Sequence, residues 1–205
     1  MSKVFDLRLL LRNPLVYTAF QRVIGANRDR RKVLQKLIPH SSDLRVLEIG
    51  CGPGINVENL PEGIQYVGCD LSKDYIVRAK KDYGTKGTFI HAPVGTLREH
   101  VSGVFDYVLS IGVLHHLNDD EVTTLCDEAR TVLAENGTFL ALEPCFAPEQ
   151  CKLERYIIAK DRGRFIRTVD QYVHLLAAKF AHVEHARFRG GNLTPNSGCV
   201  LQARI

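Results

Sequence analysis

The sequence lacks a long uninterrupted apolar run, paired cysteines and internal repeats. Its hydrophobic stretches are broken by charge within a few positions, as Arg8 and Arg12 break the first one, so we expect neither a transmembrane helix nor a cleavable signal peptide. The six cysteines have neither the close pairs of a zinc motif nor the density of a secreted disulfide scaffold. Reduced thiols and a cytoplasmic protein are therefore expected.

What remains is enough for one hydrophobic core. The chain has 205 residues and 45% hydrophobic content, which suits a single globular domain and is short for two. The net charge of +4 is uneven, because residues 1–40 carry nine Lys and Arg residues against two acidic ones. We interpret 1–40 as an amino-terminal helical lid or cap and 41–205 as the main domain. Alternatively, these helices cover a sheet edge or face.

The basic segment also bears on partners. A basic helical surface is attracted to anionic membranes or acidic ligands, although such faces are commonly just solvated. We expect no nucleic-acid partner, because no recognition motif or interleaved aromatic residues accompany the charge. Peripheral membrane contact through this segment is left open.

Short strand-like runs alternate with helical stretches after residue 43. The expected strands are 44–49, 64–70, 88–92, 105–110 and 138–143, followed by a hairpin of 182–188 and 198–205. Asn118 with Glu121 and Thr168 with Gln171 predict two capped helices, the first ending at Asn136-Gly137. The pattern predicts an α/β, doubly wound, Rossmann-like sheet of seven strands, mostly parallel, with helices on both faces.

The stretch VLEIGCGPG, residues 46–54, combines a buried strand with a glycine-rich turn. Such a turn binds nucleotides, but the dinucleotide pattern G-x-G-x-x-G fails because Ile55 stands at the third glycine position. Glu48 would repel a pyrophosphate and attract a cation. Asp70 ends the next strand, where an acid commonly accepts hydrogen bonds from ribose hydroxyls.

These motifs, with FDYVLSIGVLHHL at 105–117 and the segment 130–139, resemble those of the class I S-adenosylmethionine-dependent methyltransferases. The resemblance is greatest to the small-molecule branch that includes quinone-biosynthesis enzymes. It implies that S-adenosylmethionine is the cofactor and that no metal is needed. It also implies a set of cofactor-binding residues: Glu48, Gly50, Cys51, Gly52, Gly54, Asp70, Leu71, Ala92 and Ser110. The family often has Asp-Ala after the third strand, whereas this chain has His91-Ala92, so backbone at Ala92 is the expected adenine contact.

Candidate catalytic residues follow the fourth and fifth strands. If the acceptor atom is a hydroxyl oxygen, a general base helps, and His115 or His116 suits that role. Glu143 would orient a histidine or bind substrate. The alternatives are that both histidines only pack at a strand-to-helix junction and that Glu143 pairs with an arginine.

The segment 151–168 is rich in basic residues. Arg162, Arg164 or Arg167 would form a wall that binds a carboxylate or phosphate of an anionic acceptor, unless the segment is simply a solvated helix and loop. The predicted activity is methylation of a small molecule. A non-catalytic protein that binds the cofactor or its demethylated product remains the alternative. The missing third glycine and Glu48 disfavour a nicotinamide dehydrogenase, and the missing Asn-Pro-Pro-Tyr type motif disfavours a nucleic-acid methyltransferase.

Overall fold

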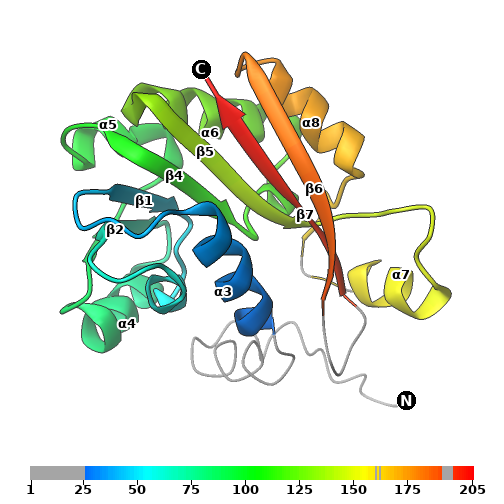
Figure 1. The fold of residues 1–205 in the computed structure, drawn as a ribbon, viewed down its shortest axis with the longest axis horizontal. Coiled ribbons are helices and arrows are strands. Elements are labelled where there is room, and N and C mark those ends of the chain that lie inside the picture. Colours follow the sequence, from blue (N-terminus) through cyan, green and yellow to red (C-terminus); the bar gives the residue numbers. More distant parts are fainter. Residues whose placement is uncertain (1–25, 160, 162, 191–195) are drawn as a thin grey trace.

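The computed structural model describes residues 26–159, 161, 163–190 and 196–205 (Figure 1). Its helices are α3 (Ala26–Leu37), α4 (Lys73–Tyr83), α5 (Leu97–His100), α6 (Asp119–Val132), α7 (Lys152–Ala159) and α8 (Val169–Ala177), with short 3-10 turns η1 (Ile55–Asn59), η2 (Val94–Thr96) and η3 (Leu114–His116). Its strands are β1 (Arg45–Ile49), β2 (Gln65–Asp70), β3 (Thr88–His91), β4 (Phe105–Ile111), β5 (Leu133–Pro144), β6 (His182–Gly190) and β7 (Asn196–Arg204).

The described strands form one seven-stranded sheet in the order β3-β2-β1-β4-β5-β7-β6 (Figure 1). Strands β1 to β5 pair in parallel, and β7 is antiparallel to both β5 and β6. The predicted fold class and terminal hairpin are confirmed. The strand order reverses between β1 and β4, and in open α/β sheets ligands bind beyond the carboxyl ends of strands at such a point.

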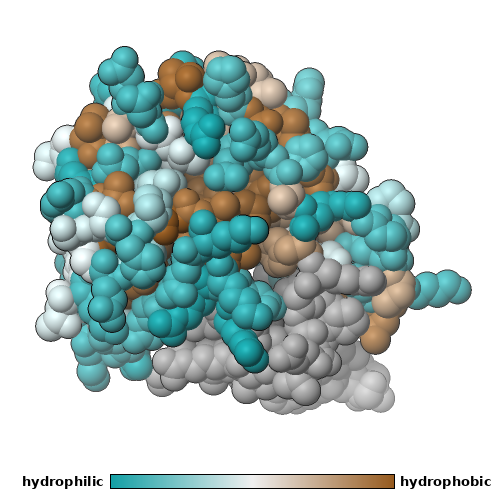
Figure 2. Space-filling model, in the orientation of Figure 1, coloured by the Kyte–Doolittle hydropathy of each residue, from teal (hydrophilic) through white to brown (hydrophobic). Residues whose placement is uncertain are grey.

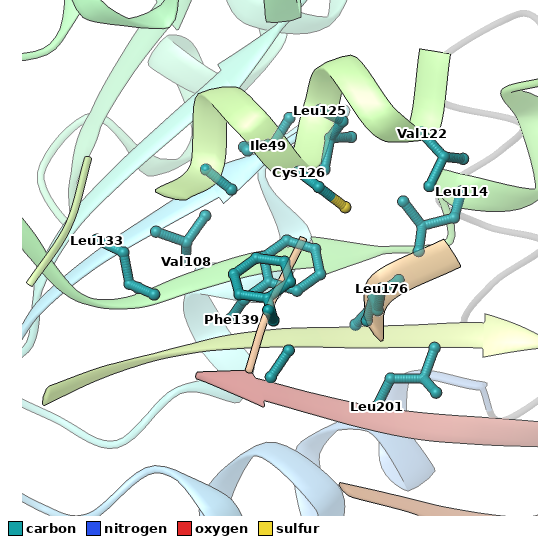
Figure 3. Close-up of a cluster of buried hydrophobic side chains, with 14 of the residues drawn as sticks. Ile49, Val108, Leu114, Val122, Leu125, Cys126, Leu133, Phe139, Leu176 and Leu201 are labelled. Atoms are coloured by element: carbon teal, nitrogen blue, oxygen red, sulfur yellow. The ribbon is translucent and has the colours of Figure 1, made fainter. Parts of the chain in front are cut away.

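Two hydrophobic clusters cover the two faces of the sheet. One is formed with α5, α6 and α8, and in Figure 3 Leu125 and Cys126 of α6 lie above Phe139 of the sheet, while Val122 lies beside Leu114. The other includes Leu34 of α3 and Ile38, both fully buried, together with residues of α4. Burial of a large aliphatic side chain contributes about 1.5–3 kcal/mol. The described part of the expected lid, α3, is thus built into the core of one face.

The helix starts follow the capping signals. Asn118 and Glu121 form a reciprocal capping box before α6, as Thr168 and Gln171 do before α8. The predicted end of α6 at Asn136-Gly137 is wrong. The helix ends at Val132, because Leu133 is already extended, is buried and pairs with Phe105 of β4.

The molecular surface is mostly polar on the face seen in Figure 2, with hydrophobic residues gathered near its centre, over the strands of Figure 1. Within the described ranges, no helix is both long and apolar enough to cross a bilayer. The basic residues up to position 25, with the lid and the membrane contact expected of them, lie outside the described residues.

Candidate cofactor and acceptor site

The glycine loop lies between β1 and η1 and is bent by three left-handed glycines. Gly50, Gly52 and Gly54 have φ values of 72°, 55° and 82°, which side chains other than glycine rarely adopt. A Cβ atom on Gly54 would lie 2.8 Å from the ring of Phe89, whereas one on Gly52 would meet nothing within 4 Å. The loop is therefore packed at Gly54 and open at Gly52, which leaves room for a ligand against its backbone.

Asp70 ties the loop to the end of β2. Its Oδ2 accepts a hydrogen bond of 2.8 Å from the Gly52 amide and its Oδ1 one of 2.7 Å from the Ser72 amide. Burial raises the pKa of Asp70, while these two amide bonds act to lower it. Each carboxylate oxygen has a second lone pair, so Asp70 can still accept bonds from a diol. The next side chain, Leu71, is 72% exposed and offers an apolar surface beside the acid.

Glu48 lies beneath the loop and is 0% exposed. Its Oε1 accepts a 2.6 Å hydrogen bond from Asn56 Nδ2, and its Oε2 accepts one of 2.5 Å from the Tyr66 hydroxyl. Burial raises its pKa to about 7, even though both hydrogen bonds favour the charged form. The structure thus buries an acid that is ready to ionise when a cation approaches. Asn56 and Tyr66 were missed from the sequence, because neither carries a motif of its own.

The other expected cofactor residues differ in what they present. The Cys51 side chain is buried, and its Sγ occupies the space beside Gly68, so Cys51 contributes backbone to the loop. The Ala92 amide already donates to the Asp70 carbonyl at 3.2 Å, so the backbone contact to adenine expected of this residue would have to use its carbonyl. His91 Nε2 lies 2.9 Å from the Leu71 carbonyl oxygen. Among the described residues, Ser110 Oγ is the buried side-chain polar atom with no hydrogen-bond partner.

Glu143, near the end of β5, organises the turn that follows β4. Its Oε1 accepts 2.9 Å bonds from the Val113 and Leu114 amides, and its Oε2 accepts one from the His115 amide at 3.3 Å. The same Oε2 lies 2.6 Å from His115 Nδ1. These contacts are compatible with Glu143 orienting a histidine, one of the two functions expected of it. Among the described residues its side-chain hydrogen bonds go to this turn and not to an arginine.

His115 bridges two carboxylates. Besides Glu143 at Nδ1, Asp161 Oδ1 lies 3.1 Å from Nε2, and the ring is 5% exposed. Burial lowers the pKa of His115, but hydrogen bonds to Asp161 and Glu143 outweigh it and raise the pKa to about 9. Conversely, although burial acts to raise it, the pKa of Asp161 is lowered to about 2 by His115. A doubly protonated ring has no lone pair, so His115 does not fit a general base in this conformation.

His116 is exposed and packs against His115, with ring centroids 4.1 Å apart and ring planes tilted by 38°. The structure therefore brings His115, His116 and Glu143 together at the carboxyl edge of the sheet. Asp161, which joins them from beyond α7, was missed. It is 46 positions from His115 in sequence, and no local pattern marks the encounter.

Three arginines were expected to bind an anion, and for Arg167 this expectation is wrong. It is 6% exposed, and its guanidinium donates to the Leu114, Leu117 and Phe165 carbonyls and to Asp119. These bonds occupy all five N–H groups of the side chain. Arg167 therefore fastens the segment before α8 to η3, and it has no N–H donor left for a substrate. Arg164 is exposed, and Arg162 lies outside the described residues.

Together, the sheet order and the glycine loop define a Rossmann-like domain in which two acids, Glu48 and Asp70, lie at the loop. The protein family described as a methyltransferase domain matches residues 46–137. A tRNA U34 carboxymethyltransferase of Psychromonas ingrahamii is 29% identical over 150 residues, covering 68% of this chain and 41% of that protein. A ubiquinone biosynthesis O-methyltransferase of Vibrio cholerae is 35% identical over 79 residues, covering 37% of this chain and 32% of that protein.

Solved structures show the same fold at low sequence identity. The mitomycin 7-O-methyltransferase MmcR has a TM-score of 0.70 at 15% identity, covering 98% of this chain and 60% of that chain. The magnesium protoporphyrin IX methyltransferase of Synechocystis, solved with S-adenosylhomocysteine, has a TM-score of 0.65 at 17% identity, covering 98% and 100%. Residues 46–137 are thus similar to a methyltransferase domain, and the chain shares its fold with solved S-adenosylmethionine-dependent methyltransferases. The alignments span less than half the length of both curated relatives.

Proposed function

We propose that this chain transfers a methyl group from S-adenosylmethionine to a hydroxyl oxygen of a small molecule. The observation that carries the proposal is the acid-and-glycine cradle formed by Glu48, the open Gly52 backbone and Asp70 in a methyltransferase domain. Several similar proteins are O-methyltransferases, which supports oxygen as the acceptor atom.

Each residue of the cradle has a distinct task. Asp70 accepts hydrogen bonds from the ribose hydroxyls, and Leu71 packs against the adenine. Glu48, whose pKa of about 7 leaves it close to ionisation at neutral pH, balances the ammonium of the methionine end through the loop. Ser110 Oγ, buried and without a partner among the described residues, supplies a hydrogen bond at the end of β4. The lid function expected of residues 1–40 remains a prediction, and positions 1–25 of that segment lie outside the described residues.

When bound, S-adenosylmethionine supplies an electrophilic methyl group on a sulfonium. The protein's part is to hold the acceptor oxygen in line and to exclude water. His116 is the better candidate to take the hydroxyl proton. Its ring is exposed, whereas both nitrogens of His115 face carboxylates. Glu143 acts by fixing η3 and so the position of both rings.

An anionic acceptor remains part of the proposal, but of the three arginines expected to bind it, the structure supports only Arg164 as a candidate. Arg164 is exposed and lies between Gly163, which packs against His115, and Phe165, whose amide donates to the His115 carbonyl. An Arg164→Ala variant should lose turnover on an anionic acceptor while keeping its cofactor affinity. Equal turnover of the variant and the wild type on that acceptor would remove the anion-binding function.

The cofactor site is tested by calorimetric titration of the untagged protein with S-adenosylhomocysteine, with NADH as the control ligand. Asp70→Ala should weaken binding roughly 10- to 100-fold, because hydrogen bonds to a charged group are each worth about 1.5–3 kcal/mol. Asp74→Ala, an acid in the first turn of α4, is the matched control and should bind as the wild type does. Absence of binding to a folded wild type would contradict the proposal.

Catalysis is tested separately by incubation with S-adenosylmethionine and a panel of phenolic and other small hydroxyl compounds. Formation of S-adenosylhomocysteine together with an O-methylated product, identified by mass spectrometry, is the expected result. Methylation at nitrogen or carbon would overturn the choice of oxygen. Tight cofactor binding without any product across the panel would favour the alternative of a non-catalytic binding protein.

A further inference from the structure

Three potential metal ligands converge beside the glycine loop, at the turn after β4. His115, His116 and Asp161 each offer one ligand atom, and these atoms all lie within 4.8 Å of one another. The two histidines come from η3, and Asp161 comes from the segment beyond α7. The site is therefore assembled from two parts of the chain that are distant in sequence.

The distance between the first two ligand atoms, one on His115 and one on Asp161, suits a shared metal ion as well as it suits a hydrogen bond. His115 Nε2 and Asp161 Oδ1 are 3.1 Å apart. Two ligand atoms each about 2.1 Å from one ion lie roughly 3.0–3.4 Å apart at octahedral or tetrahedral angles. An ion can therefore replace the shared proton between these two atoms without a large movement of either side chain.

The approach of Asp161 is built into the backbone. A Cβ atom on Gly163 would lie 2.0 Å from His115 Cδ2, so only glycine lets the backbone at this position lie against the ring. The Gly163 amide donates to Asp161 Oδ1 at 2.8 Å, and the Phe165 amide donates to the His115 carbonyl at 2.9 Å. The buried Arg167 fastens the same segment to Leu114 and Leu117.

Glu143 gives His115 the outer support that metal-bound histidines usually have. A histidine ligand typically donates its second ring N–H to a carboxylate, which fixes the tautomer and directs the other nitrogen at the metal. Here His115 Nδ1 donates to Glu143 Oε2 at 2.6 Å, and Glu143 is itself held by three backbone amides. The Nε2 atom is thereby directed at Asp161.

We propose that His115 Nε2, a ring nitrogen of His116 and the Asp161 carboxylate bind a divalent transition-metal ion of the Zn²⁺ type. Two imidazoles and one carboxylate are a ligand set typical of such ions, whereas Mg²⁺ prefers oxygen ligands alone. Binding displaces the Nε2 proton of His115 to solvent, so metal uptake releases a proton. Three protein ligands leave an open position at the edge where the acceptor is expected, and an ion there would polarise an acceptor hydroxyl in place of a histidine base.

The site is tested by calorimetric titration of untagged, EDTA-treated and dialysed protein with ZnCl₂, and in parallel with MgCl₂. We expect one Zn²⁺ per chain and no binding of Mg²⁺. His116→Ala and Asp161→Asn should each weaken Zn²⁺ binding about 100-fold or more, since even outer-sphere partners are worth about 10- to 100-fold. Both residues are exposed, so these variants should fold, which circular dichroism verifies.

Two control variants make the result specific. His100→Ala removes an exposed histidine on α5, and Cys151→Ser removes the exposed cysteine, and both should bind Zn²⁺ as the wild type does. Failure of the wild type to bind Zn²⁺ would overturn the proposal, as would unchanged affinity in the His116→Ala and Asp161→Asn variants. Because the titration needs neither cofactor nor acceptor, its outcome is independent of the proposed methyl transfer.

Discussion

The buried carboxylate of Glu48 should make the protein less stable as the pH rises. Its pKa is raised from 4.5 to about 7, chiefly by burial. Between these values the folded state keeps a proton that the unfolded state has lost, so the free energy of unfolding falls with pH in this window. At ~1.4 kcal/mol for each unit of pKa, the loss amounts to about 3 kcal/mol, complete somewhat above pH 7.

Glu48→Gln removes the ionisation and keeps nearly the same volume. We expect the difference in unfolding free energy between the variant and the wild type to grow in favour of the variant by about 3 kcal/mol from pH 4.5 to pH 8. Changes in hydrogen bonding to Tyr66 and Asn56 add an offset that does not vary with pH, so the slope carries the information. Urea unfolding across this range measures it.

Glu62→Gln, which alters an exposed carboxylate, is the matched control and should give a flat difference curve. A flat curve for Glu48→Gln as well would refute the reasoning, because it would mean that burial does not hold the proton on Glu48. The variant should also bind S-adenosylhomocysteine more weakly at pH 8, where the wild-type carboxylate is charged and balances the ligand's ammonium.

Two further perturbations test the packing around the site. Arg167→Ala should lower the unfolding free energy by roughly 2–4 kcal/mol in a urea titration, because buried carbonyls lose their donors, whereas the exposed Arg164→Ala should change it by less than about 0.5 kcal/mol. An equal effect of the two would contradict the structural assignment of Arg167. Both Gly54→Ala and Gly52→Ala are strained by the positive φ, but only Gly54→Ala also collides with Phe89, so it should cost about 1–3 kcal/mol more. Gly52→Ala should in addition weaken cofactor binding, and the reverse order of stability in thermal unfolding would refute this.

Much of the fold was predictable because its signals are local. Strand positions follow from short apolar runs, and both capping boxes were identified from residues three positions apart. The end of α6 was not predictable, because Asn136-Gly137 is a strong turn signal that competes with pairing of Leu133 against Phe105 in a strand distant in sequence. Tertiary pairing prevailed there over local preference.

The candidate site likewise contains residues that local motifs predicted and contacts that depend on the tertiary fold. Glu48, the glycines and Asp70 belong to motifs at the ends of two consecutive strands, so their proximity followed from the expected parallel sheet. The burial of Arg167 and the meeting of Asp161 with His115 depend on how the segment after β5 folds back, which no local pattern encodes. Basic composition alone placed Arg167 on the surface, whereas five backbone and carboxylate bonds make it a buried fastener.

The four hydrogen bonds that Glu143 accepts from the turn after β4 have a consequence for how this protein can change. A carboxylate from one strand dictates the conformation of a loop on its neighbour, so an insertion or deletion between 112 and 116 would misalign three amides and a histidine at once. The turn that carries the histidines is therefore expected to tolerate substitutions but to keep its length.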